Sequence, residues 1–127
     1  MGRDMDLIRK ILLEIEAKPS DATVNNLKIE GYTLQEIAYH CKILYGGGLI
    51  DYYYGVVADG GFLLRFIVGS LTLEGHEFLD KIRDDTIWDE TKETIKEKGI
   101  PFILDTVKQI SSAIIDMMIK SAVKGLN

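Results

Sequence analysis

The chain has 127 residues, 46% of them apolar, and a formal net charge of −5. This length suffices for one compact domain with an appendage, and the apolar content supports a hydrophobic core and argues against global disorder. Because dedicated nucleic-acid binders are usually basic, the negative charge argues against strong non-specific DNA binding. The single cysteine excludes an internal disulfide framework and suits a reducing cytoplasm.

The N-terminal residues show no signal-peptide pattern, and no apolar run approaches the roughly 18–20 residues of a membrane-spanning helix. Most of the acidity lies in residues 73–98, which hold nine acidic and five basic residues. No basic patch is visible elsewhere. We therefore expect a cytoplasmic protein without a membrane partner.

Residues 4–17 are predicted to form the first helix, because their apolar residues recur at three- and four-residue spacing. Lys18-Pro19-Ser20 ends it, since the residue before proline is pushed out of the α region. Residues 21–31 are ambiguous, although their apolar residues are compatible with a first short strand. The residues concerned are Val24, Leu27 and Ile29.

A second helix is predicted from Thr33 to Tyr45. Thr33 is a good N-cap, and Glu36 completes a capping box three residues later. Three glycines at 46–48 stop the helix, and we expect one of them to take a left-handed conformation. The expected buried stripe consists of Leu34, Ile37, Cys41 and Leu44, with Ala38 beside them.

A β-hairpin follows. Residues 52–57 and 62–68 have strong strand character. The linking residues Ala58-Asp59-Gly60-Gly61 suit a tight turn, because Asp-Gly and Gly-Gly tolerate the positive φ angles that such turns require. We predict a two- or three-stranded antiparallel wing packed on the helices, with Ile37, Leu44 and Phe78 in one core.

Three more helices are predicted after the hairpin. Thr72 caps a helix over residues 73–84, in which Gly75 suggests a close approach to the sheet. A charged helix follows over residues 86–98. Gly99-Ile100-Pro101 breaks the chain, and Pro101 is well placed to start a last helix that reaches Lys124.

The last helix is apolar on more than one side. One stripe holds Ile103, Val107, Ile110, Ile114 and Met117, and another holds Ile115, Met118 and Ala122. A symmetric dimer is the commonest way for a soluble protein to bury a second apolar side. We therefore predict a homodimer through residues 101–123. The alternatives are a helix folded back on the rest of the chain and an interfacial membrane helix, which lacks the expected basic face.

This order of elements predicts a mainly α protein with a small antiparallel β wing. Residues 1–85 are assigned to a winged helix-turn-helix-like domain, and residues 86–127 to a helical extension that serves as a dimerisation segment. No clear helix directly precedes Thr33, since residues 21–31 are ambiguous, and the wing is not basic. Both features depart from small transcriptional repressors, whose recognition helix often ends in a step like Gly48-Leu49-Ile50.

Three blocks of the sequence resemble a domain-of-unknown-function family of small bacterial proteins that are often associated with phages and prophages. The blocks are RDMDLIRKILLEIE, GYTLQEIAYHCKILYGGGLI and LTLEGHEFLDKIRDDTIW. The resemblance covers roughly residues 1–100. It implies a cytoplasmic, winged-helix-like protein whose activity is not established, and it transfers no catalytic or binding residue.

The candidate DNA contacts lie on the predicted second helix and in the wing. Gln35, Tyr39 and Lys42 share one helix face and are residue types that contact base edges or phosphates. Arg65 is the only cation in the wing, and a single arginine can enter a minor groove. The alternative for all four is an ordinary solvated surface.

No catalytic, metal or cofactor site is predicted. His40, Cys41 and His76 are soft-metal ligand types, but their spacing matches no known zinc pattern. The acidic run over residues 84–93 is interleaved with lysine and is typical of a solvated helix face. Nucleophile triads and phosphate-binding loops are absent from the sequence.

Two functions remain open. The first is a non-enzymatic, DNA-associated regulatory protein of phage or prophage type that binds double-stranded DNA. The alternative is a protein–protein adaptor that uses the winged-helix fold without DNA and binds a host or phage protein. The helix-to-wing pattern favours the first, and the negative charge favours the second.

Overall fold

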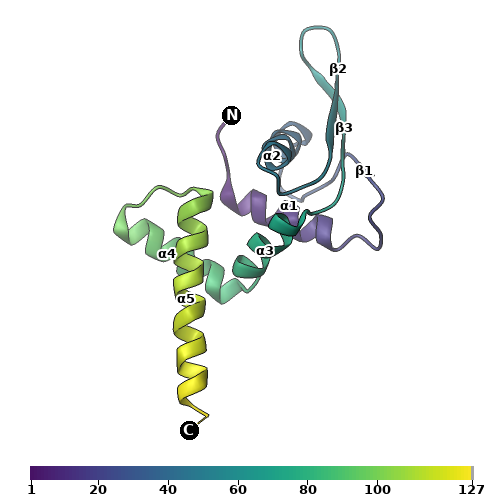
Figure 1. Cartoon of the computed structure of the whole chain (residues 1–127). Helices are drawn as coiled ribbons and strands as arrows, with labels where there is room; N and C mark the ends of the chain where they lie inside the picture. Colours follow the sequence, from purple (N-terminus) through teal and green to yellow (C-terminus); the bar gives the residue numbers. More distant parts are fainter. Residues whose placement is uncertain (127) are drawn as a thin grey trace. The chain divides into compact units, whose positions relative to one another are not determined.

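The computed structural model describes residues 1–126 and shows five helices and three strands in that part of the chain (Figure 1). A mainly helical protein with a small antiparallel sheet is confirmed. The chain divides into two compact units, Met1–Glu77 and Phe78–Asn127. The elements are α1 (Met5–Glu16), β1 (Val24–Asn25), α2 (Leu34–Gly46), β2 (Tyr53–Val57), β3 (Leu63–Val68), α3 (Leu73–Ile82), α4 (Asp85–Lys98) and α5 (Leu104–Lys124).

Helix α1 buries one complete face. Asp4 caps its first turn, because the carboxylate accepts a hydrogen bond from the Leu7 backbone N–H at 3.1 Å. The helix packs against α2 in the first unit. Its buried residues are Met5, Leu7, Ile8, Ile11, Leu12 and Ile15. The predicted helix is confirmed, and its amphipathic pattern matches the face that is buried.

The sheet has β3 in the middle, with β1 and β2 antiparallel on either side. Strand β1 stops after two residues, so the strand considered for Leu27 and Ile29 does not form there. Asn26 ends it with a positive φ of 49°. Its backbone N–H donates to the Phe66 carbonyl at 2.8 Å, and its side-chain oxygen accepts from the Phe66 N–H at 2.9 Å. Asn26 thus pairs both backbone polar groups of Phe66 at this edge of β3, and its positive φ turns the chain away from the sheet.

The predicted hairpin is confirmed. Val57 pairs with Leu63 across it. The turn is closed by a hydrogen bond from the Gly61 N–H to the Ala58 carbonyl at 3.1 Å. Gly60 and Gly61 have φ angles of 87° and 81°, which only glycine adopts readily. Strand β1 makes the sheet three-stranded.

Hydrogen bonds fix both junctions between the hairpin and the neighbouring helices. Helix α2 begins with the predicted capping box of Thr33 and Glu36. It ends in a Schellman motif: the Leu49 N–H donates to the Leu44 carbonyl, and Gly48 has φ +78°. Thr72 accepts from the Gly75 N–H at 3.0 Å and so caps α3. A side chain at Gly75 would collide with the Leu49 backbone. The predicted close approach therefore exists, against the segment that leads into the sheet.

The second unit contains a pair of packed helices, α4 and α5. Asp84 caps α4 through the Ile87 N–H at 3.0 Å, and Gly99 ends it with φ +63°. Helix α5 begins at Leu104, so the prediction that Pro101 starts it is wrong. The Thr106 hydroxyl explains the later start. It accepts from the Ile103 N–H at 3.2 Å and contacts the Pro101 carbonyl, which holds the preceding residues outside the helix.

Candidate functional site

The predicted contact residues of α2 lie on one side of the helix. Gln35 and Lys42 are exposed and Tyr39 is half-buried. The Gln35 side-chain amide donates to the Leu63 carbonyl at 3.5 Å, so it is turned toward the start of β3. The Tyr39 ring meets the His40 ring edge-on, with centroids 5.6 Å apart. Lys42 is exposed on the same side of the helix.

Arg65 is exposed but does not sit at the tip of the hairpin. It lies on β3 opposite Val56. Its guanidinium donates to the Asn25 side-chain oxygen at 3.4 Å, which directs it back toward β1. The turn itself carries Asp59 and no cation. The structure therefore places Arg65 away from the position from which a wing tip would enter a minor groove.

The opposite side of α2 is buried and is hydrogen-bonded to the start of α1. His40 is 2% exposed. Its Nε2 accepts the Asp4 backbone N–H at 2.8 Å, and its Nδ1 lies 2.7 Å from the Glu36 carbonyl. These partners require the neutral ring with its proton on Nδ1. Burial raises the pKa of the neighbouring Cys41 thiol to about 12, so that thiol stays protonated and unreactive near neutral pH.

The hairpin carries exposed apolar side chains that were not among the predicted site residues. They are Tyr54, Phe62 and Leu64, with 54%, 65% and 53% of their surfaces exposed, and we call these three residues the hairpin surface. Val57 is 60% exposed, but it pairs with the buried Leu63 and so lies on the other face of the hairpin. Figure 1 shows the hairpin extending beyond α2 in the first unit. A consecutive apolar run such as Phe62-Leu63-Leu64 was the available signal, since a strand directs neighbouring side chains to opposite faces.

Packing explains why these side chains stay outside. The inner face of the hairpin is already filled by Leu63, Phe66 and Val68, all buried. The Tyr53 and Phe66 rings stack with centroids 6.2 Å apart. Gly55 leaves room for the Tyr53 ring, because a side chain at Gly55 would meet the Tyr53 hydroxyl at 2.8 Å. The hairpin has more apolar side chains than its inner face can bury.

The electrostatics of the first unit do not favour a polyanion. Residues 1–77 hold eleven acidic and seven basic residues. One of the seven, Lys18, is used internally: its ammonium donates to the carbonyls of Ala22 at 2.7 Å and Gly69 at 2.9 Å. Exposed cations next to the hairpin are therefore sparse, so contact with DNA phosphates would release few of the DNA's counterions and yield little binding free energy.

Other features of the described residues give weaker indications of a functional site. An open groove of about 540 Å³ lies between residues 26–32 and the start of α2, where Leu34 and Ile37 line it. His76 lies 3.8 Å from the Glu16 carboxylate. Within residues 1–126, no group of three or more His, Cys, Asp or Glu side chains could hold a metal ion. No helix in this part of the chain is long and apolar enough to cross a membrane.

Comparison with known proteins identifies the family. Residues 2–101 match the family model described as Hypothetical protein (DUF2513). The chain belongs to this family. It is also 40% identical over 123 residues to a Haemophilus influenzae protein described as an uncharacterized protein. The alignment covers 94% of this chain and 99% of the relative. No solved structure matches the chain. The DUF2513 match ends at residue 101, before α5 begins at Leu104, whereas the alignment with the relative includes at least part of α5.

Proposed function

We propose that this DUF2513 protein is a non-enzymatic, cytoplasmic regulatory adaptor of winged-helix type, acting in a phage or prophage setting. The element order from α1 to β3 and the strand order β1-β3-β2 support the winged-helix assignment. The exposed apolar hairpin surface carries the functional part of the proposal. Such a surface on a soluble protein is typical of a protein-binding site.

The partner is a protein with an apolar recess or an apolar strand edge. Two hairpin residues flank the turn, Val57 and Phe62, and both are more than half exposed. Aromatic side chains at the centre of an interface contribute most of the binding free energy when they fill a pocket. Because Asp59 is the only charged residue of the turn, the partner surface around the pocket is expected to be neutral or weakly basic.

The test is quantitative capture of partners from lysate of the bacterium that carries this gene. The double substitution Phe62→Ser and Leu64→Ser should remove specific partners that the natural chain retains. Leu73→Ser is the matched control, because Leu73 is 74% exposed and lies on α3 rather than on the hairpin. The proposal fails if the hairpin variant and the control retain the same proteins in the same amounts.

DNA association is the second candidate function, and the exposed Gln35 and Lys42 on one face of α2 favour it. Random duplex DNA and a salt series provide the test. If α2 contacts phosphate, Lys42→Ala should weaken binding and lower the salt slope by about one unit. Absence of binding even at roughly 50 mM salt, where phosphate contacts are strong, would leave the protein adaptor as the remaining candidate.

Self-association belongs to the same proposal. The predicted homodimer interface comprised residues 101–123, but part of this segment is already buried within the chain. Val107, Ser111 and Ile114 are buried, and α5 packs on α4. The proposed homodimer must therefore use the remaining part of α5.

A further inference from the structure

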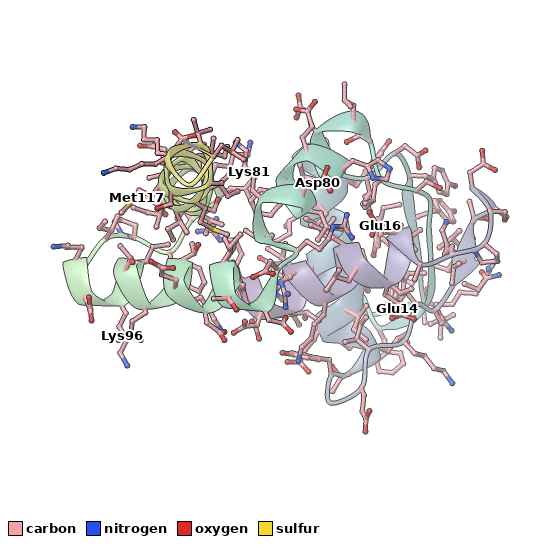
Figure 2. All side chains as sticks on the ribbon, turned by 90° about the horizontal axis from the view of Figure 1, so that it is seen from below. Glu14, Glu16, Asp80, Lys81, Lys96 and Met117 are labelled. Atoms are coloured by element: carbon pink, nitrogen blue, oxygen red, sulfur yellow. The ribbon has the colours of Figure 1, made fainter. Side chains whose placement is uncertain are left out.

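The outer edge of β2, the side that faces away from β3, exposes both apolar side chains and backbone groups. The exposed side chains of α5, such as Met117, project instead from a helix whose backbone groups bond within the helix (Figure 2). Many kinds of apolar surface can cover such a helix. A row of strand N–H and C=O groups is matched by another extended chain, so β2 restricts the class of its partner more narrowly.

Three residues of β2 direct their backbone groups away from the sheet. The Gly69 N–H donates to the Tyr52 carbonyl at 3.0 Å, and the Ala58 N–H donates to the Phe62 carbonyl at 2.7 Å. Because successive residues of a strand point their backbone groups alternately to its two sides, the even-numbered residues from 52 to 58 face β3. The odd-numbered residues face away, and they are Tyr53, Gly55 and Val57. Within residues 1–126, these three residues form no backbone hydrogen bond at the outer edge.

The outer edge of β2 lacks the usual protections of an edge strand. Charged residues, prolines and bulges normally prevent such an edge from pairing with another chain. Strand β2 contains neither a charge nor a proline, and the bulge of the hairpin adds its extra residue, Leu64, to β3. The opposite edge of the sheet is protected, because β1 has only two residues and Asn26 turns the chain away after them.

The side chains on both faces of β2 suit an apolar strand beside them. On one face, Tyr54 is more than half exposed and Val56 is half-buried. On the other face, Val57 is more than half exposed, and Gly55 leaves a gap next to the Tyr53 hydroxyl. Aromatic and β-branched residues stabilise each other across neighbouring strands. A partner strand with residues of these two kinds would therefore cover both faces of the edge.

The charges that flank β2 are both negative. Asp51 and Asp59 are exposed, and they are the only charged residues from 43 to 64. Their separation corresponds to roughly 26 Å of extended chain. Lys18 lines the same pocket as Asp51, but so do two further acidic residues, Glu16 and Asp21. The flanks of β2 therefore favour lysine or arginine at both ends of a partner strand.

A second copy of this chain is a poorer partner for the same edge. Two β2 strands that pair all three outward-facing residues must run antiparallel, with Gly55 on the two-fold axis. Asp51 of each copy then lies level with Asp59 of the other, and like charges in such positions are destabilising. Charge therefore favours a different protein over self-pairing at β2.

We propose that the outer edge of β2 binds an extended segment of another protein as a fourth strand of the sheet. The segment has uncharged β-branched or aromatic residues at its centre and lysine or arginine at its ends. This inference rests on the proposed adaptor function and names the binding mode and the chemistry of the partner. Main-chain hydrogen bonds to Tyr53, Gly55 and Val57 hold the strand, and its side chains beside Tyr54 extend the hairpin surface.

Selection of peptides by the full chain from a random display library tests the proposal. Peptides of about twelve residues exceed the roughly nine that span the distance between the two aspartates. The natural chain should enrich peptides with apolar centres and basic ends. Asp51→Asn combined with Asp59→Asn should bind these peptides several-fold more weakly, and with less dependence on salt, because the flanking charges are removed.

A substitution at Val57 tests the main-chain pairing. Val57→Pro should bind the enriched peptides roughly tenfold more weakly or worse, because proline removes an outward N–H and its ring obstructs the edge. It breaks no hydrogen bond within the sheet, since the Val57 N–H points away from β3. Val57→Ala is the matched control, because it keeps the N–H, and it should retain most of the binding. Circular dichroism establishes that both variants are folded.

Amide hydrogen exchange measured by NMR locates the bound peptide. In the free chain, the amide protons of Tyr53, Gly55 and Val57 should exchange faster than those of Tyr54 and Val56, which bond to β3. The peptide should slow exchange at the first three residues and change it less at the other two. This alternation is expected of an added strand and not of a partner that contacts side chains alone.

Three outcomes would overturn the proposal. The first is that no enriched peptide distinguishes Val57→Pro from Val57→Ala. The second is binding that Phe62→Ser with Leu64→Ser removes and Val57→Pro leaves intact, which would refute strand addition but keep the adaptor function. The third is self-association that Val57→Pro abolishes, which would identify a second copy as the occupant of the edge. Failure of the adaptor function itself is detected separately, by the lysate comparison of the Phe62 and Leu64 variant with its control.

Discussion

Helix α1 and the second half of α5 have similar amphipathic patterns and opposite surroundings. The apolar residues whose spacing predicted the α1 face are all buried: Met5, Ile8, Ile11, Leu12 and Ile15. In α5, by contrast, Met118, Ile119 and Val123 are each more than half exposed. Helical periodicity therefore predicts that a face will be covered. Whether that face is buried by the same chain or by a partner depends on contacts between residues distant in sequence.

The largest expected effect lies in the α1 face. Leu12 is fully buried, so Leu12→Ala should lower the free energy of unfolding by about 2–5 kcal/mol through lost burial and the cavity left behind. Urea denaturation followed by circular dichroism measures this loss. A change below roughly 1 kcal/mol, the range of ordinary surface substitutions, would mean that α1 is not held as the structure shows.

The next largest effect concerns the hydrogen bond between His40 on α2 and the Asp4 N–H at the start of α1. His40→Ala leaves the Asp4 N–H without its acceptor in a partly buried position, which should cost about 1 kcal/mol. His40→Gln should cost less, since a side-chain amide oxygen can accept the same hydrogen bond. Equal losses in the two variants would indicate that His40 contributes by packing alone.

Cys41 predicts a pH dependence on the alkaline side. Its thiol has a pKa of about 12 in the folded chain, against an ordinary value of 9.0. The folded state therefore favours the protonated thiol. This contribution to stability is fully present below pH 9 and falls by about 1.4 kcal/mol per pH unit between the two values.

Comparison with Cys41→Ala isolates the contribution of the thiol. The variant should be less stable at pH 7 but should lose less stability between about pH 9 and 10.5, because it has no thiol to ionise. Parallel stability curves for the two proteins would contradict the assignment.

The smallest effect is expected at the free end of α5. Met118→Ser changes an exposed side chain, so in dilute solution it should alter stability by no more than about 0.5 kcal/mol. In concentrated solution the same substitution should reduce self-association. A large loss in dilute solution would show that Met118 is covered within one chain, and the contrast with α1 would disappear.

Local chemistry explains which features were predictable. The caps at Thr33 and Thr72 and the glycines of the hairpin act on residues within three or four positions, so their patterns are visible in the sequence. Pro101 failed as a helix start, because the Thr106 hydroxyl contacts its carbonyl. That contact spans the loop, and it competes with a general preference of proline for the first turn.

The long-range features could not be read from the sequence. The acceptor role of His40 depends on Asp4, which lies 36 residues away. The end of β1 depends on Asn26 bonding Phe66, 40 residues away. The sequence prediction of the α2 contact face named residues that are exposed or half-buried, but the hairpin surface was not among the predicted site residues. Its exposure follows from how completely the other side of the hairpin is filled.

The most direct test of the central claim, that the hairpin surface binds a protein, is photo-crosslinking in living bacteria. A photoreactive amino acid replaces Phe62 in one strain and Leu73 in another, both exposed positions on different elements. The account predicts a discrete crosslinked protein adduct at position 62 that is absent at position 73. No adduct at position 62, or the same adducts at both positions, would contradict it.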